Sequence, residues 1–195
     1  MSNVSGIIGI SSGESIRFGA FYDKLSEVER PPRTKITHAV GLYTYRNRND
    51  IAKIAVDHGA EWVWYVDDDH IFQTDTLTRL LTHNLDIVSG FYVSRSLPFW
   101  PQRYYKTQAN GYVVKQGFHA QDIGGLQPVC AVGAGCLLVK TAVLKALGPY
   151  PWQMGKSTEG ETLGEDLDFC SRAIAKGFNI WCDLDLPVGH IATSI

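Results

Sequence analysis

The chain of 195 residues is long enough for one compact domain with a sizeable core, and its 45% hydrophobic and 19% charged residues are ordinary for a globular protein. A formal net charge of −2 argues against a broad nucleic-acid-binding face, which is usually basic. No apolar stretch is long enough to span a bilayer, and the first residues lack the basic and apolar regions of a secretory signal. We therefore expect a single domain over residues 1–195, with no transmembrane segment and a cytoplasmic location.

Short apolar runs alternate with segments of helical periodicity, a pattern typical of an α/β domain with a mainly parallel sheet flanked by helices. The expected strands are residues 7–10, 39–45, 62–66, 87–93, 129–139 and 178–182. The expected helices are residues 15–28, 49–58, 74–82, 141–147 and 165–176. Between them, residues 98–125 are expected to form hairpins or loops, and residues 148–164 a polar loop. The cysteines form no CxxC pair, and we expect buried free thiols.

The most informative motif is a run of three aspartates, Asp67, Asp68 and Asp69, directly after the apolar residues 62–66. Ligands of open α/β sheets bind at the carboxyl ends of the strands. In an extended chain Asp67 and Asp69 face the same side, where two carboxylates can hold Mg²⁺ or Mn²⁺ and leave positions for phosphate oxygens. The alternative is a solvated acidic turn or the cap of the helix that follows.

A second acidic group, Glu165 and Asp166, follows Gly164 at the start of an expected helix. The helix dipole alone favours acids at this position, which is the simpler interpretation. The preceding loop carries Tyr150 and Trp152 and leads straight into the acids, so it would suit a mobile lid over a site.

His190 follows the last expected strand. A lone histidine is more often structural than a ligand, but a neutral imidazole would complete a Mn²⁺ site to which Asp67 and Asp69 supply two ligands.

These motifs resemble those of the GT-A glycosyltransferases, in particular a minimal version of the family 2-like group. Residues 67–69 resemble the DxD motif, residues 164–166 the xED motif and residues 189–191 the C-terminal histidine motif. Further similar segments are Arg46-Asn47, residues 90–95 and residues 133–139, and the motifs occur in the family's order over nearly the whole chain. The resemblance implies a Rossmann-like GT-A fold and a metal-dependent, inverting transfer of a sugar from a nucleotide sugar, with a UDP-linked donor favoured, to the hydroxyl of an unidentified acceptor.

The resemblance also implies a role for individual residues, with Mn²⁺ or Mg²⁺ as the cofactor. Asp69 and His190 would ligate the metal, Asp67 would contact the metal or the ribose, and Asp166 would be the general base. The donor site would further include Asp68, Arg46, Arg95, Gly135 and Glu165. Trp152 would contact the acceptor or belong to the lid.

Two other functions remain open at this point. A nucleotidyltransferase can share this type of fold, but it usually has a phosphate loop rich in Gly and Lys or Arg, and residues 11–14 are a poor candidate. A nucleotide- or carbohydrate-binding module without turnover would not need the set of acids and histidine described above.

Overall fold

The computed structural model describes residues 4–13, 18–106, 113–115, 124–156, 160 and 162–191. Its central feature is a seven-stranded sheet in the order β2-β1-β3-β10-β5-β13-β8. The strands are β1 (Gly6–Ser12), β2 (Thr34–Val40), β3 (Trp62–Asp67), β5 (Ile87–Phe91), β8 (Leu126–Val129), β10 (Cys136–Lys140) and β13 (Ile180–Pro187). Five strands run parallel to one another, while β10 and β8 run antiparallel to their neighbours. The predicted mainly parallel sheet is confirmed.

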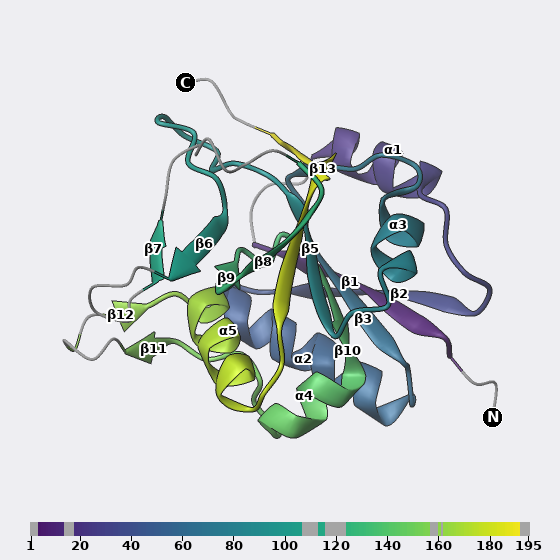
Figure 1. The fold of residues 1–195 in the computed structure, drawn as a ribbon. Helices are drawn as coiled ribbons and strands as arrows, with labels where there is room; N and C mark the ends of the chain where they lie inside the picture. The colour runs from purple at the N-terminus through teal and green to yellow at the C-terminus, as the bar shows by residue number, and fades with distance from the viewer. Residues whose placement is uncertain are drawn as a thin grey trace.

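Helices cover both faces of this sheet (Figure 1). One face carries α2 (Thr44–Asp57), α4 (Thr141–Leu147) and α5 (Glu165–Ala175), and the other carries α1 (Gly19–Glu27) and α3 (Thr76–Thr82). Side chains of β1 alternate between the two, so that Ile7 packs under the first layer and Ile8 and Ile10 under the second. Two apolar cores on opposite sides of one sheet explain why its central strands are continuous apolar runs.

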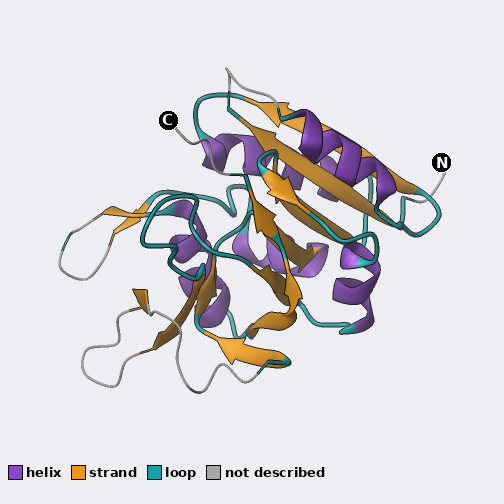
Figure 2. Cartoon of the chain, turned by 90° about the horizontal axis from the view of Figure 1, so that it is seen from above, coloured by secondary structure: helices purple, strands orange, loops and turns teal. Residues whose placement is uncertain are grey.

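Shorter ladders extend the fold. β4 (His70–Ile71) pairs with β14 (Gly189–His190). β6 (Arg103–Lys106) pairs with β7 (Val113–Lys115) and β9 (Ala131–Val132), and β11 (Gly155–Lys156) pairs with β12 (Thr162–Leu163). In Figure 1 the strands β6, β7, β11 and β12 lie at one side of the molecule, and Figure 2 shows this side from above.

Several predicted boundaries differ from the structure. The strand expected at residues 39–45 is β2, which ends at Val40, because the buried Asn47 amide donates to the carbonyls of Ser12 and Gly41 and stabilises a turn there. The strand expected at residues 129–139 is divided into β8, β9 and β10. The loop expected at residues 148–164 contains β11 and β12. Of the helix expected at residues 15–28, residues 15–17 lie outside the described part, as do 107–112 and 116–123 of the expected hairpin region.

The structure also bears on the cysteines and on membrane-spanning helices. The four cysteines are thiols that form no disulfide, as expected, with Cys136, Cys170 and Cys182 buried and Cys130 half-buried. Among the described residues, no helix combines the length and apolar character needed to cross a bilayer.

Candidate functional site

The candidate site lies at the edge of the sheet where β3 ends. The buried apolar strand β3 delivers Asp67 to this edge, and the chain turns through Asp68 and Asp69 into β4. The short strand β14 then returns from the C-terminal part of the chain and pairs with β4, so that His190 lies directly opposite His70. Opposed residues of an antiparallel pair point to the same face, and the two imidazoles are therefore side by side.

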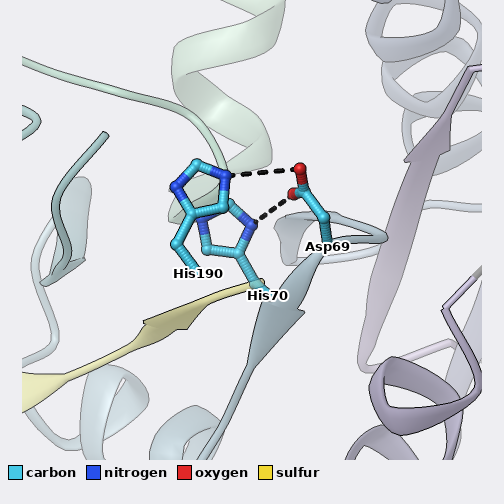
Figure 3. A group of neighbouring side chains, drawn as sticks. All are labelled: Asp69, His70 and His190. Atoms are coloured by element: carbon cyan, nitrogen blue, oxygen red, sulfur yellow. Dashed lines mark hydrogen bonds and ion pairs between the residues drawn. The ribbon is translucent and has the colours of Figure 1, made fainter. Parts of the chain in front are cut away.

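Asp69, His70 and His190 form a compact cluster (Figure 3). Their potential ligand atoms all lie within 4.8 Å of one another. His190 Nε2 lies 3.3 Å from Asp69 Oδ2, and His70 Nδ1 lies 3.0 Å from Asp69 Oδ1. The two rings stack with centroids 4.4 Å apart. These contacts change the acidity of Asp69. Burial opposes ionisation of its carboxyl, but the two histidines outweigh burial and hold the pKa of the carboxyl well below its usual value.

The donor set of this cluster fits a divalent cation. His190 Nδ1 donates to the carbonyl of Val93 at 2.8 Å, an arrangement that leaves the lone pair of Nε2 directed at Asp69. His70 is 1% exposed; its Nδ1 makes the 3.0 Å contact with Asp69, and its Nε2 has no hydrogen-bonding partner among the described residues. A buried, unsatisfied imidazole is costly, and coordination would satisfy it. Because Mg²⁺ prefers oxygen ligands, two imidazoles and one carboxylate suit a transition metal such as Mn²⁺ better.

A second cluster of charges lies beside the first. The guanidinium of Arg48, from α2, donates to both oxygens of Asp67 at 2.9 and 3.1 Å and to Glu165 Oε1 at 2.6 Å. Burial works against the charged guanidinium, but the carboxylates of Asp67 and Glu165 outweigh it and raise the pKa of Arg48. Asp67 therefore has its two oxygens directed at Arg48, and it is not part of the cluster around Asp69.

Asp166 follows Glu165 in the first turn of α5, where Gly164 is the N-cap. Burial raises the pKa of the Asp166 carboxyl, with the Arg48 guanidinium opposing and Glu165 adding to the shift. In the structure the largest contribution is burial, which favours a carboxyl that binds a proton more readily than a solvated one.

One pocket of about 370 Å³ brings these groups together. Its lining comprises Thr44, Arg48, Asp67, Asp69, His70, Tyr92, Ser94, Arg95, Ser96, Gln102, Ala134, Glu165, Asp166 and His190. A larger pocket of about 470 Å³ lies between α2, α4 and residues 148–151. Its lining is mainly aliphatic side chains with Lys53, Asp57 and Lys145 at the rim, and it contains no histidine and no cluster of acids. The smaller pocket is therefore the candidate site.

Comparisons with known proteins identify the fold. No protein-family model and no curated protein sequence matches the chain. Among solved structures, the crystal structure of A197 from STIV has a TM-score of 0.62 at 14% identity, over 97% of this chain and 87% of that one. GalNAc-T7, solved with UDP, GalNAc and Mn²⁺, has a TM-score of 0.62 at 10% identity, over 97% of this chain and 44% of its own. The chain has a glycosyltransferase-like fold. It spans less than half the length of GalNAc-T7, and at these identities the likeness concerns the fold.

Most of the site residues expected from the sequence meet in the pocket of this glycosyltransferase-like fold. They are Asp67, Asp69, Arg95, Glu165, Asp166 and His190. Arg95 Nη1 lies 3.0 Å from Asp69 Oδ2 at the exposed side of the site. Gly135 lies behind the pocket: a Cβ there would be 2.5 Å from His70 Cε1 and 3.2 Å from Asp67 Oδ2, so the missing side chain allows both groups to occupy their positions.

Three expected site residues lie elsewhere. Arg46 is exposed, with its guanidinium over the rings of Tyr43 and Tyr45, and Asp68 is buried outside the pocket lining. Trp152 is fully buried rather than on a lid, stacked on Phe169 with centroids 4.1 Å apart. Asn49 holds Trp152 in this position. Its side-chain amide donates to the Trp152 carbonyl and accepts from the Trp152 N–H, which attaches this part of the loop to α2.

Among the pocket residues to which the sequence reasoning gave no role, Arg48, His70 and Tyr92 contribute most to the geometry and charge of the site. Arg48 could have been found from helical spacing, because it lies four and seven residues before Ala52 and Ala55 on the buried face of α2. His70 directly follows the aspartates, but only the pairing of β4 with β14 brings His190 opposite it, and the local sequence does not reveal this pairing. Tyr92 accepts a hydrogen bond from the Gly135 amide at 3.0 Å, and burial, reinforced by Asp67, raises the pKa of its phenol.

Proposed function

We propose that this chain transfers a sugar from a nucleotide sugar, best matched by a UDP-linked donor, to an acceptor hydroxyl in a metal-dependent, inverting reaction. The observation that carries the proposal is the Asp69–His70–His190 cluster, which shares one pocket with Asp166. The pocket lies at the edge of the sheet where α/β folds bind ligands. A structural neighbour solved with UDP, GalNAc and Mn²⁺ supports the choice of donor and metal.

Each group in the pocket has a distinct task in this reaction. Asp69, His70 and His190 would hold the cation, which when bound supplies Lewis-acid stabilisation of a departing diphosphate. Arg95, beside Asp69, adds positive charge on the exposed side of the same position. Asp67 and Glu165, paired with Arg48, form the wall on the donor side. The cytoplasmic location expected from the sequence and the single-domain organisation belong to the same proposal.

Asp166 is the proposed general base. The acceptor hydroxyl gives its proton to the Asp166 carboxylate as its oxygen forms a bond to the anomeric carbon. The bond from that carbon to the diphosphate oxygen breaks, and its electron pair leaves with the diphosphate. Burial helps this role, because a raised pKa brings a carboxylate closer to the operating pH and makes it a stronger base.

The first test is the metal dependence of nucleotide binding. Calorimetry should detect UDP binding in the presence of Mn²⁺ and little or none with EDTA, because the carboxylates of the pocket repel a diphosphate. Asp69→Asn and His190→Ala should each weaken metal-dependent binding at least about 10-fold, whereas His58→Ala, an exposed histidine beyond α2, should not. Equal UDP affinity with and without EDTA would contradict the proposal.

A second test separates the three candidate functions. A panel of nucleotide sugars is incubated with simple sugar and alcohol acceptors, and NMR records the anomer of the product. Transfer with inversion supports the proposal. Release of pyrophosphate from a nucleoside triphosphate would identify a nucleotidyltransferase, and tight binding without turnover a binding module.

A further inference from the structure

Arg48 is a buried cation that joins three elements at the wall of the candidate site. Its side chain is 4% exposed and belongs to the inner face of α2. Through Nη2 it holds both oxygens of Asp67, the last residue of β3, and through Nη1 it holds Glu165, the first residue of α5. The guanidinium therefore fixes the end of β3 relative to the first turn of α5.

The position of Asp166 depends on the contact between Arg48 and Glu165, because Asp166 is the next residue in the chain. It follows Glu165 directly, and its Oδ1 accepts a hydrogen bond from the Leu167 amide at 2.8 Å. The turn is closed by the amide of Asp168, which donates to the Gly164 carbonyl at 3.1 Å. Because Glu165 and Asp166 share one turn, a displacement of Glu165 moves Asp166 as well.

We propose that Arg48 is a positioning residue, which holds Asp67 in the pocket wall and, through Glu165, holds Asp166 where it can take a proton from the acceptor. This inference rests on the proposed function, in which Asp166 is the general base. It also assigns Asp67 to Arg48 and leaves the cation to Asp69, His70 and His190.

The geometry requires arginine rather than any cation. A guanidinium presents several N–H donors in a rigid, planar fork and can bond two carboxylates in fixed directions at once. A lysine ammonium in its place would keep the positive charge, but with a single nitrogen it could not place separate donor groups against Asp67 and Glu165 as Nη2 and Nη1 do. Charge and position can therefore be separated by substitution.

The experiment compares Arg48→Lys, Glu165→Ala and Glu165→Gln, with Lys53→Met as the control. Lys53 lies on the same helix and forms an exposed ion pair with Asp57, away from the pocket. The measurements are the affinity for Mn²⁺ alone, and the kcat and KM for the donor as functions of pH. We expect Mn²⁺ affinity within about two-fold in all variants, because Arg48 does not contact the cluster. We expect kcat to fall about 10- to 100-fold in Glu165→Ala with little change in KM, since small displacements of reacting groups are costly.

The pH profile distinguishes position from charge. The charged and titratable groups that act on Asp166 are Arg48, Glu165, Tyr92, Tyr104 and Cys170. Removal of the Glu165 charge by itself lowers the pKa of Asp166, so a purely electrostatic role would shift the acid limb to lower pH and leave the plateau of kcat unchanged. Positioning predicts a lower plateau in Glu165→Ala and a partial recovery in Glu165→Gln, whose amide oxygen can still accept a hydrogen bond from Arg48.

Amide hydrogen exchange tests the inference without any substrate. In Arg48→Lys and Glu165→Ala we expect exchange at Leu167 and Asp168 to accelerate at least about 10-fold, with no change in Lys53→Met. Accelerated exchange in a chain that turns over no nucleotide sugar would refute the proposed function but retain the anchoring role of Arg48. Unchanged exchange at these amides, or an unchanged plateau of kcat in Glu165→Ala, would overturn the inference.

Discussion

Burial raises the pKa of the Asp166 carboxyl, while the Arg48 guanidinium lowers it and Glu165 adds to the rise. The native state therefore binds a proton at this carboxyl more readily than the unfolded chain does. The stability contributed by this group is fully present below the unfolded pKa and is lost as the pH rises through the native pKa. At neutral pH the ionised carboxylate is consequently a source of instability, which the proposed role of Asp166 as a base would explain.

Asp166→Asn should therefore change activity and stability in opposite directions. The amide cannot accept the acceptor proton, and turnover should fall about 10²- to 10⁴-fold. The amide also carries no charge to desolvate, so the free energy of unfolding, measured with urea at pH 7, should rise. This gain should shrink as the pH approaches the unfolded pKa of aspartate. Near-normal turnover, or a lower stability at pH 7, would contradict the assignment.

At the scale of elements, α2 connects the core to the site. The helix buries Ile51, Ala52 and Ala55 against the sheet, and Arg48 lies one turn earlier on the same face. Gly9 of β1 allows close packing here, because a Cβ at this position would clash with the Ile51 side chain. The rotation of the helix about its axis, set by this apolar stripe, is what directs Arg48 towards Asp67 and leaves Arg46 in solvent.

Substitutions within α2 should test this packing. Ile51 is fully buried, so Ile51→Ala should lower the free energy of unfolding by about 2–5 kcal/mol through lost burial and the cavity that it leaves. Val56 on the same helix is 36% exposed, and Val56→Ala should change the free energy of unfolding by only about 0.5 kcal/mol. Chemical denaturation of both variants provides the comparison. Equal losses would show that the core contact of α2 does not have the importance given to it here.

At the scale of the whole molecule, the cluster joins segments that are distant in sequence. Asp69 and His70 follow β3, whereas His190 lies near the end of the chain. A cation held by all three would link the two parts in the native state only. Ligands that bind the native state alone raise its apparent stability.

Thermal unfolding should consequently respond to metal. With Mn²⁺ at about 100 times its dissociation constant the native state gains about 2.7 kcal/mol, which for a chain of this size corresponds to a Tm rise of roughly 5–11 °C. His70→Ala should lose most of the rise, and His58→Ala should keep it. A full rise in His70→Ala would exclude His70 from the ligands, and the absence of any rise in the unmodified chain would contradict the metal site.

The local pattern of the sequence was sufficient for the α/β class and for the acidic residues at the end of β3 and the start of α5. These predictions depend on periodicity and on residue types a few positions apart, which the sequence displays directly. The acidic run after β3 and the family resemblance together pointed to Asp69 and His190 as candidate ligands, and in the structure His190 Nε2 lies 3.3 Å from Asp69 Oδ2.

Only the tertiary structure decided the remaining features. The pairing of β4 with β14 places His70 beside His190. Contacts with Asn49 and Phe169 hold Trp152 in the core. β10 joins the sheet antiparallel to β3. Arg48 rather than Arg46 enters the site, although the two are only two residues apart. Each of these outcomes depends on contacts between segments far apart in the chain, whose free energies are set by the packing of the whole fold and leave no periodic pattern in the local sequence.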